Sequence, residues 1–205
     1  MYKNKLALVL ISFFAIAGTQ AQVNFKPGLR AGLSLSTISE MHADYRPDFY
    51  LGGFGELNLT KRYALQPEIN YTRQGSNNVA RNFIDPDTQL ERMEYEDLRL
   101  NYVSLSLINK FTFGQGFQIQ FGPALDFLVN DNLAFRKTSR DFSFVAGLGY
   151  RMPSGLAFEF RLKKGFLDVL ESDYYSNNSN DHYLFGNYNT NVNFQIGVSY
   201  SFDAK

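Results

Sequence analysis

The sequence predicts an all-β protein, an eight-stranded antiparallel transmembrane β-barrel that runs as an up-and-down meander behind an N-terminal signal peptide. The first observation is the final segment, residues 192–202, where apolar or aromatic residues alternate strictly with polar or small ones. A period of two is that of a β-strand with two different faces. The segment has about the length of a tilted transmembrane strand, roughly 9–11 residues.

Two further observations support this fold class. The chain holds 20 Phe and 13 Tyr at a slightly polar mean hydropathy of −0.26, and no long apolar run follows residue 21. This combination is typical of a membrane barrel, in which only every second residue faces lipid. The connections between the expected strands also alternate between long and short, as they do in transmembrane barrels.

Residues 1–21 resemble a secretory signal peptide. Lys3 and Lys5 provide the positive start, an apolar core covers 6–17, and Thr19 and Ala21 place small residues before the cleavage point. The apolar core is shorter than the ~20 residues of a membrane-spanning helix. A buried N-terminal helix is the alternative, but the segment lacks an amphipathic stripe. We therefore expect a signal peptide at 1–21 and a barrel domain at 22–205.

Charge and cysteine content exclude several classes of function. The chain has 20 basic and 20 acidic residues, so removal of Lys3 and Lys5 leaves 18 against 20, a net charge of −2. This balance is unlike that of a nucleic-acid-binding protein. The absence of cysteine excludes a disulfide framework, a lipid-anchoring cysteine and a thiolate metal site.

Four strands are expected in the first half of the chain, at 25–35, 49–59, 63–73 and 98–113. In each of them one set of alternate residues is mostly apolar. These lipid-facing sets are Phe25, Pro27, Leu29, Ala31, Leu33 and Leu35; Phe49, Leu51, Leu57 and Leu59; Tyr63, Leu65, Pro67, Ile69 and Tyr71; and Val103, Leu105, Leu107, Phe111 and Phe113. Pro67 predicts a local bulge, because proline cannot donate to the ladder. Asn109 is a polar exception on the outer face.

The second half predicts strands at 117–127, 142–150, 156–163 and 192–202. Their expected lipid-facing residues are Phe117, Ile119, Phe121, Leu125 and Phe127; Phe142, Phe144, Ala146, Leu148 and Tyr150; Leu156, Phe158, Phe160 and Leu162; and Val192, Phe194, Ile196, Val198, Tyr200 and Phe202. Polar and small residues occupy the positions between them.

The expected connections are of two kinds. Those at 36–48, 74–97, 130–140 and 164–191 are long and polar, whereas those at 60–62, 114–116 and 152–155 are tight turns. Transmembrane barrels have short periplasmic turns and long outer loops. We therefore expect the outer membrane as the location, with both termini in the periplasm.

Several segments resemble the PorT-like outer-membrane β-barrel family. They are Lys26–Ser36, Leu65–Gly75 with its Leu-Gln-Pro-Glu and Gln-Gly elements, Leu100–Leu105, Phe121-Gly122-Pro123 and Gly147–Tyr150. The resemblance covers nearly all of residues 22–205, and Ser106 stands where the family often has proline. It implies an outer-membrane barrel. The family's namesake takes part in a protein-secretion system, which no residue of this chain specifically indicates.

Charged residues occur repeatedly on the inward face of the expected strands. An eight-stranded barrel encloses just enough room for side chains, and unpaired buried charges are costly. We therefore expect an ion-paired lumen, with Lys26 and Lys163 as further inward bases. The expected charge network consists of Arg30, Glu56, Glu68, Lys110, Asp126, Glu159 and Arg161. A small channel for ions or solutes is the alternative.

No pattern in the sequence predicts catalysis, a cofactor or a metal. His42 and His182 fall in expected outer loops, with Asp44 and Asp181 nearby, so a surface hydrolase is a minor alternative. Two histidines without a third ligand do not make a metal site. Asp85-Pro86-Asp87 and residues 176–181 lack the spacing of an EF-hand calcium loop.

The sequence thus predicts a non-catalytic barrel that supports the envelope or binds a partner. Its expected surroundings are outer-membrane lipid, with barrel-assembly machinery during insertion and no nucleic acid. The segments at 36–48, 74–97 and 164–191 are the expected contacts for an envelope protein. A small channel and a component of a protein-secretion machinery are the alternatives.

Overall fold

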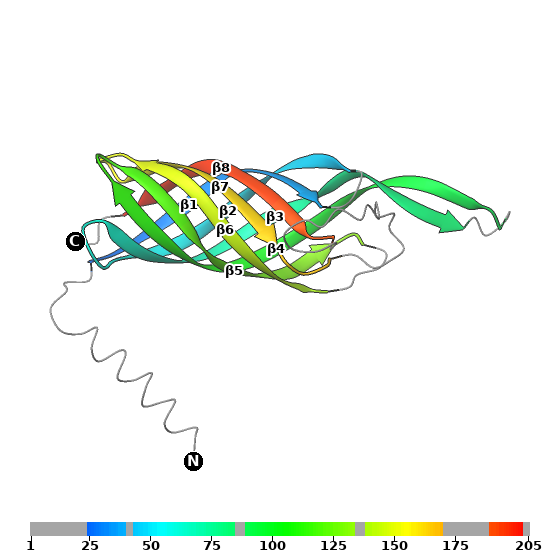
Figure 1. Ribbon diagram of the computed structural model, residues 1–205, viewed down its shortest axis with the longest axis horizontal. Helices are drawn as coiled ribbons and strands as arrows, with labels where there is room; N and C mark the ends of the chain where they lie inside the picture. Colours follow the sequence, from blue (N-terminus) through cyan, green and yellow to red (C-terminus); the bar gives the residue numbers. More distant parts are fainter. Residues whose placement is uncertain (1–23, 40–42, 85–88, 134–137, 170–188, 203–205) are drawn as a thin grey trace, which may run out of the picture.

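The computed structural model describes residues 24–39, 43–84, 89–133, 138–169 and 189–202 as a closed antiparallel barrel (Figure 1). The predicted signal peptide at 1–21 lies outside the described residues. No helix in the described ranges is long and apolar enough to span a membrane. The strands are β1 (Asn24–Ile38), β2 (Asp44–Asn58), β3 (Tyr63–Ile84), β4 (Glu91–Phe113), β5 (Phe117–Asp131), β6 (Arg140–Arg151), β7 (Leu156–Gly165) and β8 (Asn191–Ser201).

Each strand pairs with its neighbours in the chain, and β1 pairs with β8 to close the ring. The closing ladder runs from Gly28 opposite Ser201 to Ile38 opposite Asn191. Closure pairs the backbone N–H and C=O groups of the two edge strands, for which lipid offers no hydrogen-bond partners. The predicted fold class, an eight-stranded antiparallel meander, is confirmed.

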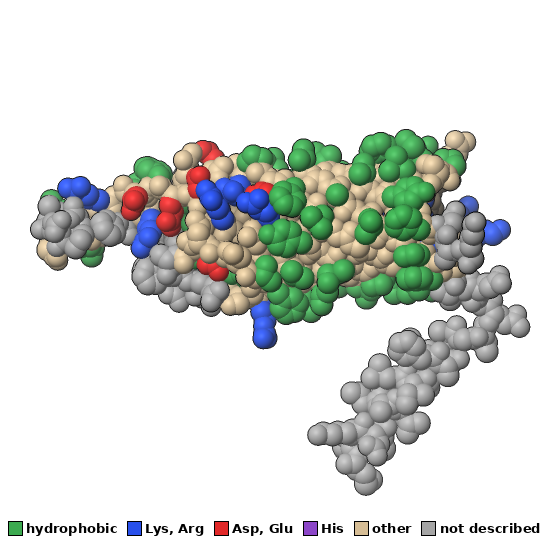
Figure 2. Space-filling model, turned by 180° about the vertical axis from the view of Figure 1, so that it is seen from behind, with side chains coloured by type: hydrophobic (Ala, Val, Ile, Leu, Met, Phe, Trp, Pro, Cys, Tyr) green, Lys and Arg blue, Asp and Glu red, His purple; other side chains and the backbone are tan. Residues whose placement is uncertain are grey.

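The predicted inward and outward faces are also those of the structure. Ile196 is 61% exposed on the outer wall, whereas the adjacent Gln195 is 6% exposed inside. Hydrophobic side chains form a belt around the wall, and charged side chains gather beyond one end of it (Figure 2). Asn109, the polar exception, lies outside as expected. It accepts a 2.8 Å hydrogen bond from the Tyr63 hydroxyl and donates one of 3.3 Å to the Phe121 carbonyl, so its amide is satisfied within the wall.

The predicted bounds of two connections are wrong. The expected loop at 36–48 is mostly strand, because β1 continues to Ile38 and β2 begins at Asp44. The expected loop at 74–97 is mostly a hairpin, in which Val79 pairs with Glu96 and Ile84 with Glu91. This hairpin projects from the end of the barrel opposite the short turns (Figure 1). Outside the lipid there is no reason for strict apolar alternation, so the period-two pattern fails there.

The predicted bulge at Pro67 is also wrong. The β2–β3 ladder is interrupted beside it but resumes in the same register, from Phe54 opposite Glu68 to Leu57 opposite Leu65. Register shifts occur nearer the projecting hairpin, between Tyr45 and Tyr50 on β2 and between Ser76 and Val79 on β3. The strand thus accommodates proline by losing hydrogen bonds locally, without an inserted residue.

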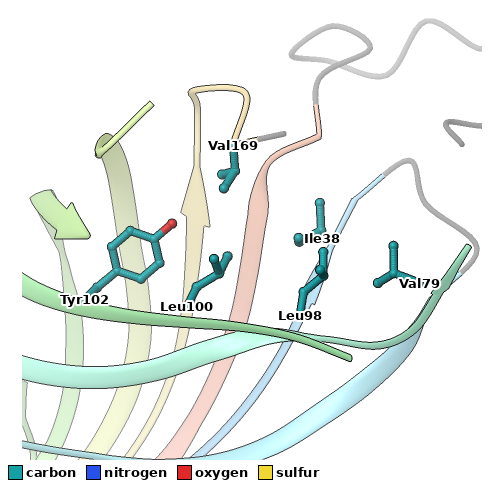
Figure 3. Packing of buried hydrophobic residues seen from close by; sticks show 6 residues of the cluster. All are labelled: Ile38, Val79, Leu98, Leu100, Tyr102 and Val169. Atoms are coloured by element: carbon teal, nitrogen blue, oxygen red, sulfur yellow. The ribbon is translucent and has the colours of Figure 1, made fainter. Parts of the chain in front are cut away.

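Buried hydrophobic residues gather at the hairpin end of the lumen. Ile38, Val79, Leu98, Leu100, Tyr102 and Val169 form this apolar cap (Figure 3). They come from β1, β3, β4 and the segment after β7. A smaller group of Ile108, Ala124 and Val145 lies on the inner wall of β4, β5 and β6. Between the cap and the short turns the lumen is filled by polar and charged side chains.

Candidate functional site

Buried charged side chains from six strands meet inside the barrel. Inward alternation brings Arg30 from β1, Glu56 from β2, Glu68 from β3, Lys110 from β4 and the pair Glu159 and Arg161 from β7 into one region. Arg151, at the end of β6, joins them. These seven residues, the lumen network, carry four positive and three negative charges.

Glu68 receives hydrogen bonds from two arginines, one on β1 and one on β7. Arg30 donates to it at 2.9 Å, and Arg161 donates to its two oxygens at 3.0 and 2.9 Å. Gln66 and Asn70, two residues away on the same face of β3, add bonds of 2.6 and 3.1 Å. This carboxylate therefore links β1, β3 and β7 across the lumen.

Glu159 connects the same arginines to the lysine of β4. Its oxygens lie 3.4 Å from Arg30, 3.3 Å from Arg161 and 3.3 Å from Lys110. Ser199 and Gln120 donate to it at 3.1 and 3.3 Å. These five partners come from five different strands, β1, β4, β5, β7 and β8, so the Glu159 carboxylate cross-links the wall from inside.

Glu56 continues the chain of contacts toward the short turns. Lys110 lies 3.8 Å from it, and the two terminal nitrogens of Arg151 donate to both of its oxygens. Such bidentate pairing is a strong form of guanidinium–carboxylate contact.

Asp126, the remaining residue of the predicted network, lies in a separate cluster. Ser143 donates to it at 2.6 Å, and Ser104 and Lys163 bond to it as well. Lys163 also donates to Ser104 at 2.8 Å. The structure thus places Asp126 among β4, β6 and β7, with no ion pair to the seven residues of the lumen network.

Aromatic rings line part of the network. The Arg30 guanidinium lies 4.7 Å from the centroid of Tyr50, and the Lys110 ammonium lies 5.5 Å from that of Phe54. Tyr50 fits because Gly32 and Gly197 leave room for its hydroxyl, which lies 2.8 Å from the position a Gly32 Cβ would take. These contacts favour positive charge next to the ring faces.

Little empty volume remains between these side chains. A cavity of about 10 Å³ lies among Glu56, Lys110 and Arg151, and another of about 10 Å³ lies among Arg30, Glu68 and Arg161. A water molecule needs at least roughly 10–15 Å³ of such space. Each cavity therefore has room for about one water, and neither has room for a hydrated ion.

Two contributors were absent from the predicted set. Arg151 is the last residue of β6, beyond the alternating residues from which the faces are predicted. Only its position beside a short turn, at the same end of the barrel as Glu56, could have indicated that it reaches the lumen. Lys163 was recognised as an inward base, but its partner Asp126 could not be assigned without the shear of the barrel. The alternation in the sequence predicts that Ser104 and Ser143 face inward. It does not predict that both hydroxyls donate to Asp126.

The described residues offer no candidate metal site. In the described ranges, no three His, Cys, Asp or Glu side chains come together in a way that could hold a metal ion. His42 and His182, the two candidates for surface hydrolysis, lie outside the described residues, as do Asp85-Pro86-Asp87 and 176–181.

Comparison with known proteins gives one family and several similar folds. The model of the outer membrane protein beta-barrel domain family matches residues 6–202. Neisserial surface protein A shares 16% identity at a TM-score of 0.48, with 87% of this chain and 97% of that chain covered. Ail of Yersinia pestis, solved with the heparin analogue sucrose octasulfate, shares 10% at 0.47, covering 87% and 99%. OprG from Pseudomonas aeruginosa shares 12% at 0.47, covering 90% and 99%. No curated protein matches the sequence.

Proposed function

Since the chain belongs to the outer membrane protein beta-barrel domain family, it is an outer-membrane β-barrel protein, and we propose that it acts as a closed, non-catalytic barrel that presents its projecting hairpin to an envelope partner. The packed lumen is the observation that carries this proposal. Seven charged side chains cross-link the wall, and the apolar cap covers the hairpin end. Both termini lie in the periplasm, with the short turns.

Conductance in planar bilayers tests the closed lumen. Protein refolded into lipid vesicles, with its strand content checked by circular dichroism, is fused into a bilayer beside an established porin as positive control. We expect no steady current from this protein, because a hydrated ion has no room in the cavities beside Glu56 and Glu68. A stable open current of porin size would refute closure and favour the channel.

The hairpin arm, residues 79–84 and 91–97, is the proposed contact for a partner. It extends beyond the paired parts of β2 and β5, and its two faces differ. Ile84, Met93 and Tyr95 are exposed on one face, 60%, 52% and 64% respectively, whereas Arg81 and Glu94 lie on the other. An exposed apolar face next to unpaired strand edges is the kind of surface that binds proteins.

Site-specific photocrosslinking tests this contact in native envelopes. A photoreactive residue at position 95 reports on the apolar face, and the same residue at position 94 is the matched control on the charged face. We expect a discrete crosslinked product from position 95 and little from position 94. Equal yields from both, or none from 95, would contradict partner binding through the apolar face.

A role in protein secretion is the second candidate. Two of the segments that resemble the PorT-like family, 65–75 and 100–105, form neighbouring stretches of β3 and β4 and lead toward the arm. Deleting the gene and quantifying secreted proteins tests this role. Unchanged secretion would exclude it and leave the free-standing barrel.

A further inference from the structure

Two arginines point outward from the wall where the apolar belt ends. Arg73 on β3 lies between the buried Thr72 and Gln74, and Arg99 on β4 lies between the buried Leu98 and Leu100. Because neighbouring side chains of a strand alternate between faces, both arginines project away from the lumen. They belong to the outer surface, at the end that carries the hairpin arm.

A glycine lies between these arginines on the outer face of the β3–β4 ladder. Gly75 lies opposite Arg99 in the β3–β4 ladder and two residues after Arg73 on the same face. Its φ of 140° favours glycine, and a Cβ there would collide with the Leu98 carbonyl oxygen and lie 3.3 Å from Cδ of Arg46. Gly75 itself is buried, and the largely buried side chain of Arg46 packs against it between Arg73 and Arg99. We call this group, Arg46, Arg73 and Arg99, the arginine cluster.

The cluster has more positive charge than its neighbours balance. Asp48 lies 3.4 Å from Nε of Arg73 and 3.5 Å from Arg46. No described residue forms an ion pair with Arg99. Asp97 and Asp44, each two residues from an arginine of the cluster, accept hydrogen bonds from Asn78 at 3.1 and 2.7 Å. Three guanidinium groups with one paired carboxylate leave a surplus of two positive charges, which favours a polyvalent anion such as phosphate.

The aromatic residues beside the cluster set its depth relative to the membrane. The Arg73 guanidinium lies 5.4 Å from the ring centroid of Phe49, and the rings of Phe49 and Tyr71 are 6.4 Å apart. Phe49 belongs to the exposed hydrophobic belt. Aromatic residues at the edge of such a belt mark the membrane interface, where lipid headgroups lie.

We propose that Arg73 and Arg99, with Arg46 beside them, bind the phosphate of a phosphorylated lipid headgroup in the outer leaflet. Arg73 and Arg99 lie close together on the outer face, as diagonal neighbours in the β3–β4 ladder, so both can reach the same phosphate, and the exposed ring of Phe49 beside Arg73 contacts the upper part of the lipid. The choice of leaflet rests on the proposed orientation, with the termini in the periplasm. The binding of phosphate by the arginines does not depend on that orientation.

Lipid binding in neutral detergent micelles tests the cluster. The probes are diphosphorylated lipid A, the same lipid after enzymatic removal of its phosphates, and inorganic phosphate alone, with binding followed by native mass spectrometry. We expect Arg73→Gln and Arg99→Gln each to weaken binding of diphosphorylated lipid A about tenfold, which corresponds to ~1.4 kcal/mol per charge-assisted contact. Arg62→Gln, an exposed arginine in the turn at the opposite end, is the matched control and should leave the affinity unchanged.

Three outcomes would overturn the proposal. Equal affinities of the wild type and a variant that carries both Arg73→Gln and Arg99→Gln would exclude the cluster as the site. Inorganic phosphate binding as tightly as the lipid would make it a site for a free anion, and a loss of affinity confined to Arg62→Gln would move the site to the other end.

Orientation is measured separately, by labelling Leu90→Cys on intact cells with a membrane-impermeant maleimide. If Leu90→Cys is not labelled on intact cells and the protein still binds the lipid, the proposed orientation is refuted and the cluster lies in the inner leaflet. Loss of lipid selectivity with labelling retained would refute the cluster alone.

Discussion

Replacing Glu68 by alanine should destabilise the barrel by about 3 kcal/mol. In the structure Glu68 accepts two arginine contacts at 2.9 Å, from Arg30 and Arg161. After its removal these arginines keep longer contacts with Glu159, of 3.4 and 3.3 Å. The surplus of positive charge in the lumen network rises from one to two. Breaking a buried ion pair costs about 3–5 kcal/mol, and the remaining contacts with Glu159 place this case at the lower end.

Guanidinium chloride unfolding in detergent, followed by circular dichroism, measures the effect. At a slope of about 4 kcal/mol per molar, a loss of 3 kcal/mol lowers the midpoint by roughly 0.8 M. Glu94→Ala is the control, because Glu94 is an exposed acid on the hairpin arm and its loss should change stability by less than about 0.5 kcal/mol. If Glu68→Ala unfolds at the same midpoint as Glu94→Ala, the lumen network is not what stabilises the wall.

Three further outcomes are expected from the same structure. Ile196→Arg should impair insertion into vesicles by about 2–4 kcal/mol because its side chain faces lipid, whereas Gln195→Glu should be tolerated beside Arg30, which already donates to Gln195 at 3.5 Å. Equal insertion yields of the two variants would mean that the assignment of the faces is wrong. Leu98→Ala should cost about 2–5 kcal/mol in unfolding free energy, since Leu98 is fully buried in the apolar cap, and a loss below 1 kcal/mol would show that the cap is loosely packed. Unboiled protein should migrate faster than boiled protein on a denaturing gel because the closed ladder resists unfolding, and identical migration would argue against a stable barrel.

Period-two alternation was sufficient to predict the faces of the transmembrane strands. Gln195 and Ile196 differ in environment because lipid and lumen impose opposite chemistry on adjacent residues, and this difference is visible in the sequence. The same logic misplaced the ends of β3 and β4, since Glu91–Leu98 has water on its outer side and is free of that constraint. The bulge expected at Pro67 failed for another reason. A missing donor can be accommodated by an interrupted ladder as well as by an inserted residue.

The lumen was predictable as a set of charges but not as a set of pairs. Inward phase identified Arg30, Glu68, Glu159 and Arg161, yet which cation meets which carboxylate depends on the shear of the barrel and on side-chain length. Arg151 reaches Glu56 across 95 positions of sequence, and Asp126 joins Lys163 in a separate cluster. The arginine cluster was equally hidden, because it depends on Gly75 lying opposite Arg99 and against Arg46.

The length of the hairpin arm determines how far from the membrane surface another protein can contact this one. Its six residue pairs, from Val79 opposite Glu96 to Ile84 opposite Glu91, extend the wall by about 20 Å at ~3.4 Å per residue. That reach exceeds the thickness of a phospholipid headgroup layer, which is roughly 5–8 Å on each side of the ~30 Å hydrocarbon core. A large partner held away from the membrane by sugars or by its own bulk therefore meets Tyr95 and Met93 before it meets the rim of the barrel. Shortening the arm would leave the barrel inserted and bring the proposed binding face back to the level of the headgroups.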